Sequence, residues 1–246
     1  MTQTTNRPSD HPEIPMSPKL PGGPIAARPL HFIFLADCSS SMAGDKIAAL
    51  NHAIREAIPH MREVARGNPN ASVLVRAIAF SSGAQWHVSQ ATPVDAFEWK
   101  DLSAHGMTAM GQALQLAGEA LKTPPMPERA LPPVLVLVSD GAPTDDFARG
   151  LSALMSEPWG KKAVRLAIAI GEDADESRLQ EFIGHVELQV LRAGNAQDLV
   201  KFIRWASTAV LQAASAPASQ TRVSPAGVNV PLPPPPATSV DANDVW

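Results

Sequence analysis

The sequence has one cysteine, no cluster of basic residues and no long apolar run, and each absence excludes a class of protein. Because Cys38 is alone, the chain cannot form an internal disulfide framework, which fits a reducing compartment. The formal net charge is −4, and no block of Lys or Arg offers the basic patch of a nucleic-acid-binding protein. The strongly apolar runs, such as Val134–Val138, are too short to span a bilayer.

Several sequence signatures are also missing. The N-terminal segment is polar and lacks the apolar stretch of a signal peptide, so we expect a cytoplasmic protein without a membrane segment. No glycine-rich dinucleotide fingerprint and no P-loop is present. The seven histidines show no HExxH or HxH spacing. Nucleotide cofactors and a histidine-based zinc site are therefore not expected.

Proline marks both ends of the chain. Of 24 prolines, seven lie in residues 1–29 and seven in residues 217–236. Because proline fixes φ and removes a backbone donor, we predict disordered tails at 1–27 and 214–246 around a domain at 28–213. The run Pro231–Pro236 favours polyproline II, either as a solvated tail or as a docking peptide anchored by Asp244–Trp246.

Strand and helix patterns alternate between the tails. Near-continuous apolar strands separated by amphipathic helices indicate a mostly parallel sheet covered on both faces. The expected fold is therefore α/β, Rossmann-like and doubly wound, with six strands that include one short antiparallel edge strand. The predicted strands are 30–36, 73–80, 85–88 (the edge strand), 134–138, 163–170 and 188–191, and the predicted helices are 44–65, 109–121, 145–155, 176–183 and 196–211.

The most informative segment follows the first predicted strand. Asp37, Ser39 and Ser41 place one carboxylate and two hydroxyls at alternate positions directly after an apolar run. Open α/β sheets bind ligands at the carboxyl ends of their strands. Carboxylate and hydroxyl oxygens suit Mg²⁺ or Mn²⁺ better than zinc or copper. The segment therefore predicts one loop of a metal site.

Two further segments offer oxygen ligands of the same kind. Thr108 lies in a glycine-flanked loop before a predicted helix, and Asp140 directly follows the strand 134–138. Asp145 and Asp146 are interpreted as acids at a helix N-terminus, with charge tuning of the site as the alternative. Cys38 is interpreted as a small buried residue, since a nucleophile would need a base beside it.

With these residues, the sequence from about 29 to 211 closely resembles the von Willebrand factor A family. The family's metal-ion-dependent adhesion site has the pattern D-x-S-x-S, then T, then D, which Asp37, Ser39, Ser41, Thr108 and Asp140 match. The resemblance implies that the two serines ligate Mg²⁺, with Mn²⁺ or Ca²⁺ as alternatives. It implies that Thr108 does so directly or through water, and that the two aspartates hold metal-bound waters.

The resemblance also implies what kind of partner binds, and the sequence departs from the family's pattern at one position. A protein partner would supply an Asp or Glu carboxylate to the metal, without catalysis. The residue between the serines is often glycine in the family and is Ser40 here, which removes no ligand.

Three segments, 44–51, 75–81 and 137–145, look like the bacterial TerY-type proteins associated with tellurium resistance and stress response. That resemblance implies a scaffold or regulator acting with a serine/threonine kinase and a PP2C-like phosphatase, with a link to phage defence. One alternative is a subunit of an AAA-type ATPase or chelatase complex. Another is a Mg²⁺-dependent phosphatase, although Ser39 stands where the haloacid-dehalogenase group needs Asp.

Overall fold

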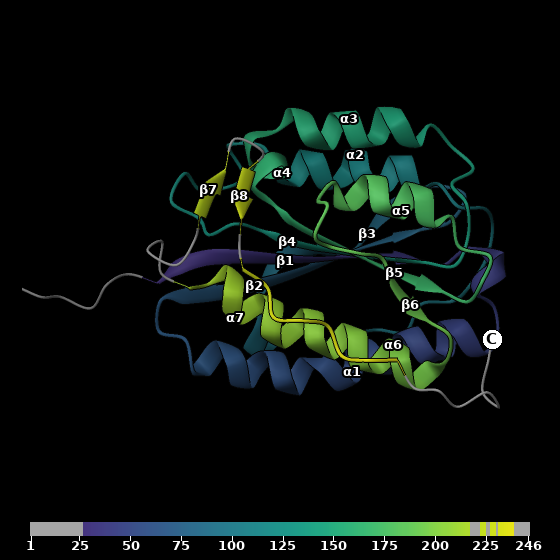
Figure 1. Cartoon of the computed structure of the whole chain (residues 1–246), viewed down its shortest axis with the longest axis horizontal. Coiled ribbons are helices and arrows are strands. Elements are labelled where there is room, and N and C mark those ends of the chain that lie inside the picture. The colour runs from purple at the N-terminus through teal and green to yellow at the C-terminus, as the bar shows by residue number, and fades with distance from the viewer. Residues whose placement is uncertain (1–26, 217–221, 225–226, 230, 239–246) are drawn as a thin grey trace, which may run out of the picture.

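One six-stranded sheet runs through the centre of the computed structural model, which describes residues 27–216, 222–224, 227–229 and 231–238 (Figure 1). The strand order is β3-β2-β1-β4-β5-β6, and every neighbouring pair is parallel except β2 and β3. The strands are β1 (Arg28–Asp37), β2 (Ala71–Phe80), β3 (Ala84–Pro93), β4 (Val134–Ser139), β5 (Val164–Ile170) and β6 (Leu191–Ala193).

Helices cover both faces of the sheet, and each face has its own core. Helices α1 and α6 lie on one face, and α2, α3 and α5 on the other (Figure 1). Side chains of β1 alternate between the two cores, with Phe32 and Phe34 on the α1 side and Ile33 and Leu35 on the α2 side. The helices are α1 (Asp45–Arg66), α2 (Met110–Ala120), α3 (Phe147–Ser156), α4 (Pro158–Lys162), α5 (Glu176–Ile183), α6 (Ala196–Trp205) and α7 (Leu211–Ala214).

Glycine allows α2 and α3 to pack with their backbones in contact. A Cβ built on Gly150 would lie 2.2 Å from the carbonyl oxygen of Gly111, and one on Gly111 would lie 2.4 Å from the carbonyl oxygen of Asp146. Both distances are shorter than side chains tolerate. The first turn of α2 is therefore locked against the start of α3, next to the carboxyl end of β4.

The predicted fold class is confirmed, with differences in detail. The antiparallel edge strand β3 has ten residues, so it is not short, and β6 begins three residues later than predicted. The helix predicted at 196–211 is divided by a π-helical turn at Ala206–Val210, where Thr208 donates its hydroxyl to the carbonyl of Arg204. Two 3-10 turns, Ser40–Met42 and Val94–Ala96, were not predicted. None of the described helices has the length and apolar composition needed to cross a membrane.

Part of the predicted C-terminal tail has a described structure. Short antiparallel strands β7 (Arg222–Ser224) and β8 (Gly227–Asn229) pair with each other. Leu232, in the described segment 231–238, packs against the core on the α1 and α6 side. The contact of Leu232 lies in the proline-rich run for which the sequence offered either a solvated tail or a docking peptide, and the predicted bounds of the domain and its tails stay predictions. The N-terminal tail and the Asp244–Trp246 anchor lie outside the described residues.

Two of the apolar strands each contain a buried polar side chain. Arg165 of β5 is only 9% exposed, and its guanidinium donates to the carbonyl of Gly160 in α4 and to those of Phe182 and Ile183 at the end of α5. His31 of β1 is 5% exposed, and its Nδ1 has no hydrogen-bond partner. Burial, with the nearby positive charge of Arg76, lowers the pKa of His31 from 6.5 to about 4.

The shifted pKa of His31 predicts how stability depends on pH. Between pH 6.5 and about 4 the unfolded chain binds a proton at His31 and the native chain does not, so the free energy of unfolding falls as the pH falls. At about 1.4 kcal/mol per pKa unit, the loss approaches about 3 kcal/mol. Urea unfolding of wild type and His31→Leu at several pH values should show a shallower decline in the variant. An equal decline of the free energy of unfolding with falling pH in both proteins would contradict the lowered pKa of His31.

Candidate metal site

The site lies where the sheet changes its direction of winding. From β1 the chain proceeds outward to β2 on one side, while β4 leads to β5 on the other, so the β1–β4 boundary is a topological switch point. The two strands are parallel neighbours in a register that pairs Ala36 with Val138. Asp37 and Asp140, which follow these residues closely, are therefore brought to the same edge of the sheet although 103 positions separate them in sequence.

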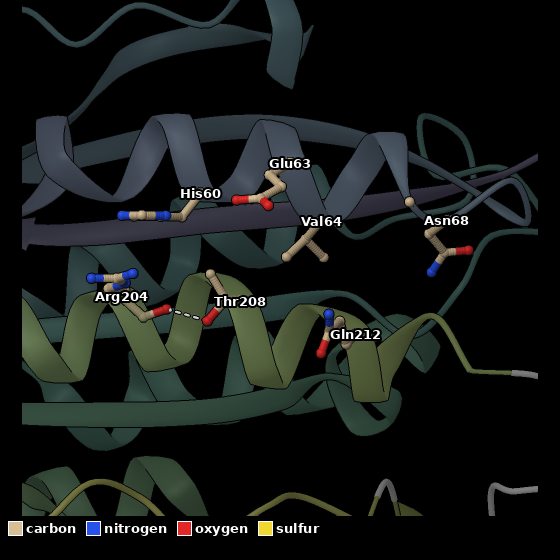
Figure 2. A pocket seen from close by; sticks show the side chains of 8 residues that line it. His60, Glu63, Val64, Asn68, Arg204, Thr208 and Gln212 are labelled. Carbon is tan, nitrogen blue, oxygen red and sulfur yellow. Dashed lines mark hydrogen bonds between the residues drawn. The ribbon is translucent and has the colours of Figure 1, made fainter.

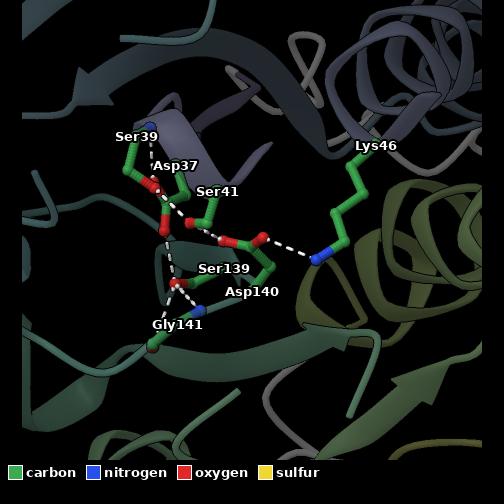
Figure 3. A network of polar contacts seen from close by, with 7 residues as sticks. All are labelled: Asp37, Ser39, Ser41, Lys46, Ser139, Asp140 and Gly141. Atoms are coloured by element: carbon green, nitrogen blue, oxygen red, sulfur yellow. Dashed lines mark hydrogen bonds and ion pairs between the residues drawn. The ribbon is translucent and has the colours of Figure 1, made fainter. Parts of the chain in front are cut away.

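Hydrogen bonds connect the oxygen-bearing side chains into one network (Figure 3). Asp37 accepts from the backbone N–H of Ser39 at 2.8 Å and from the hydroxyl of Ser139 at 2.5 Å. The hydroxyls of Ser39 and Ser41 are 3.0 Å apart, and Ser41 donates to Oδ1 of Asp140 at 2.7 Å. Four of the five predicted site residues therefore belong to one connected network.

Thr108 approaches this network from a separate loop. A Cβ built on Gly141 would lie 3.8 Å from both Oγ of Ser41 and Oγ1 of Thr108, so both hydroxyls face the same glycine. The backbone of Thr108 is tied to Thr144 by two hydrogen bonds, of 3.1 and 2.9 Å. All five predicted residues thus meet at one place, contributed by three loops.

The loop before Thr108 is held by Asn51 and Gly106. Oδ1 of Asn51, in α1, accepts from the indole N–H of Trp99 at 3.0 Å and from the backbone N–H of Leu102 at 2.9 Å. Gly106 has φ of 74° and accepts from the N–H of Ser40, while a Cβ there would lie 2.3 Å from the hydroxyl of Ser82. Only glycine suits this position, and it joins the loops of Ser39 and Thr108.

The site concentrates buried negative charge. The Asp37 and Asp140 side chains are completely buried. Burial raises the pKa of Asp37, whereas the hydrogen bonds from Ser139 and Ser39 act in the opposite direction. Lys46 of α1 forms a 2.8 Å ion pair with Oδ2 of Asp140. Buried carboxylates need such compensation, because an unpaired charge is costly in a low dielectric.

The donor set fits a hard divalent ion. Two carboxylates and three hydroxyls provide only oxygen atoms, which Mg²⁺ prefers. Within the described residues, no group of three or more His, Cys, Asp or Glu side chains is arranged to hold a metal, so a softer ion has no competing site of that type there. The arrangement suits binding of an ion at the carboxyl ends of β1 and β4, where the three loops meet.

Three contributors were not assigned by sequence reasoning. Ser139 donates a hydrogen bond to Asp37, and Lys46 forms an ion pair with Asp140. The hydroxyl of Thr144 accepts a hydrogen bond from the backbone N–H of Thr108. Ser139 and Thr144 flank Asp140 closely in sequence, and this proximity was the available signal. Lys46 gave no such signal, because a lysine in a helix is ordinarily a surface residue.

Cys38 and the two acids after Asp140 have structural roles. Cys38 is 3% exposed and its thiol contacts the carbonyl of Phe80 at 3.3 Å, while burial and the charge of Asp37 raise its pKa to about 11. Asp146 caps α3, as expected, by accepting from the N–H of Arg149. Asp145 instead accepts from the N–H groups of Gly111 and Gln112, both at 2.8 Å, and so caps α2.

A polar groove lies elsewhere, between α1 and the α6–α7 segment (Figure 2). Its volume is about 440 Å³. It begins at His60, 14 residues beyond Lys46, which corresponds to roughly 20 Å along α1 at 1.5 Å per residue. It is therefore separate from the candidate metal site. Its lining residues are His60, Glu63, Val64, Gly67, Asn68, Arg204, Thr208 and Gln212.

Fold and site together define an open, doubly wound α/β domain with a hydroxyl and carboxylate cluster at its switch point. Residues 32–142 match the family profile of the von Willebrand factor type A domain. This part of the chain is therefore similar to the von Willebrand factor type A domain. No curated protein matches the sequence.

Solved structures share this fold at low sequence identity. A von Willebrand factor type A protein from Catenulispora acidiphila has a TM-score of 0.58 and 20% identity, covering 80% of this chain and 44% of that one. The ArnB paralog VWA2 from Sulfolobus acidocaldarius has a TM-score of 0.54 and 19% identity, covering 73% and 45%. Proximal thread matrix protein 1 from the mussel byssus was solved with a zinc-occupied MIDAS motif. It has a TM-score of 0.55 and 16% identity, covering 77% of this chain and 48% of that one. The chain thus spans about half the length of these structures.

Asp145 and Asp146 form a matched pair for testing how the site is supported. Asp145→Ala removes two charge-assisted hydrogen bonds from the first turn of α2, and we expect a loss of about 3 kcal/mol in the free energy of unfolding. Asp146→Ala removes one capping bond from α3 and should cost about 1 kcal/mol. Chemical denaturation measures both values. If the two variants lose equal stability, the role of Asp145 in joining α2 to the β4 loop is wrong.

Proposed function

We propose that this protein is a metal-dependent protein-binding module whose metal accepts a carboxylate from a partner. The observation that carries the proposal is the meeting of Asp37, Ser39, Ser41, Thr108 and Asp140 at the switch point. A bound Mg²⁺ would supply an electrophilic centre with a position open to a partner's Asp or Glu.

The residues divide this work according to their chemistry. Ser39 and Ser41 offer neutral hydroxyls as direct ligands, which would leave the ion electrophilic. Thr108 offers a third hydroxyl from its own loop. Asp37 and Asp140, fully buried behind the serines, would orient the hydroxyls and hold metal-bound water. The zinc-occupied motif of the mussel protein supports a metal role for this fold and makes Zn²⁺ an ion to include in titrations, beside Mg²⁺, Mn²⁺ and Ca²⁺.

At a finer level, we propose a scaffold or regulator in a bacterial kinase–phosphatase signalling system, with a link to stress response, tellurite resistance or phage defence. The support is the resemblance of segments 44–51, 75–81 and 137–145 to TerY-type proteins. The partners would then be a serine/threonine kinase and a PP2C-like phosphatase in the cytoplasm. Co-purification with an ATPase instead would favour the alternative of an AAA-type ATPase or chelatase subunit.

Removing two hydroxyls should remove the metal. In Ser39→Ala combined with Ser41→Ala, we expect calorimetric Mg²⁺ binding to be lost while the protein stays folded without metal. Its melting temperature should fall modestly, because the buried carboxylate of Asp140 loses its hydrogen bond from Ser41. Ser40→Ala is the matched control, since the Ser40 side chain is exposed and lies between them. Mg²⁺ binding that persists in the double variant would refute the site assignment.

Partner capture should depend on the metal. We expect affinity purification in Mg²⁺ to recover a partner that EDTA releases and that Asp37→Ala and the double serine variant fail to recover, as identified by mass spectrometry. Capture that is indifferent to EDTA would mean that the helices or the segment 231–238 carry recognition instead.

A phosphatase assay separates binding from catalysis. We expect the purified protein with Mg²⁺ to release no phosphate from a generic phosphoester substrate. Phosphate release that disappears in Asp37→Ala would support the enzymatic alternative.

A further inference from the structure

Lys46 brings a positive charge into the candidate metal site. Its ammonium lies 2.8 Å from Oδ2 of Asp140, and its side chain is only 18% exposed (Figure 3). Most ion pairs of the described residues join two well-exposed side chains, whereas the acid here is completely buried. The contact therefore acts in a low dielectric, where charges interact strongly.

The position of Lys46 in its helix argues for a role at the site. It is the second residue of α1, where the partial positive charge of the helix N-terminus disfavours a cation. Neither helix stability nor solubility explains a half-buried lysine at this position. The carboxylate of Asp140 compensates for the cost of placing a partly buried ammonium near the positive end of the helix dipole.

The two oxygens of Asp140 face different partners. Oδ1 accepts from the hydroxyl of Ser41, which is a proposed metal ligand, and Oδ2 accepts from Lys46. Asp37, by contrast, has contacts to Ser39 and Ser139 and none to a cation among the described residues. Lys46 thus neutralises one of the two buried carboxylates and sets the direction in which the other oxygen of that carboxylate points.

We propose that Lys46 is a resident counter-ion that preserves the metal-free site and competes electrostatically with the divalent ion, which makes metal binding weak enough to be reversible. The proposal rests on the proposed metal-binding function. Without the ammonium, two buried carboxylates would face each other at the end of β1 and β4, and the site would have a higher affinity for a divalent cation.

The test is a comparison of Lys46→Met with wild type by calorimetric titration of the full chain with MgCl₂ and MnCl₂. We expect at least tenfold tighter binding in the variant. Lys46→Arg keeps the charge and should stay within threefold of wild type. Lys161→Met, an exposed lysine outside the site, controls for the change in net charge.

A second measurement does not involve metal. In EDTA, Lys46→Met should melt below wild type, and the same substitution in an Asp140→Asn background should have little further effect, because the partner carboxylate is gone. Equal or weaker metal binding in Lys46→Met, with binding by wild type intact, would overturn competition by Lys46 and leave the proposed function standing. Absence of binding in both proteins would overturn both proposals.

Discussion

The structure depends on the cost of placing two carboxylates, Asp37 and Asp140, in a buried position at the ends of two neighbouring strands. Unpaired charges in such a place are unfavourable by several kcal/mol. Hydroxyls of Ser41 and Ser139, the N–H of Ser39 and the ammonium of Lys46 compensate in part. The concentration of acceptor oxygens that remains is what favours a divalent cation, so the metal-binding proposal follows from the same constraint that shapes the loops.

The surrounding scaffold keeps these loops in place. Strand β1 is buried from Leu30 to its end and paired on both sides, so Asp37 begins from a rigid position. Gly106 joins the first and second loops, Thr144 joins the second and third, and Asp145 fastens the third loop to α2. Each loop is therefore held by the other two, which allows a site of short polar side chains to keep one geometry.

The open, doubly wound α/β fold accounts for the position of the site at the β1–β4 switch point, but the particular partner is not a property of the fold. The likeness to solved structures lies at 20% identity and below for the proteins described, and this supports the architecture alone. In this chain a lysine from α1, Lys46, reaches the hydroxyl-rich cluster. The thiol of Cys38, beside this cluster, is buried with a raised pKa and is therefore not activated as a nucleophile.

Sequence by itself determined the α/β class, most strands and helices, and the cluster after β1, because these depend on short-range periodicity and on residues that are consecutive in the chain. The grouping of Thr108 and Asp140 with Asp37 came from the family resemblance. Tertiary structure decided the rest: the π-helical turn after α6, the capping of α2 by Asp145 and the pairing of Lys46 with Asp140. These features join residues that are far apart or shift hydrogen bonds by one position, and only strand order, register and helix packing determine which of them meet.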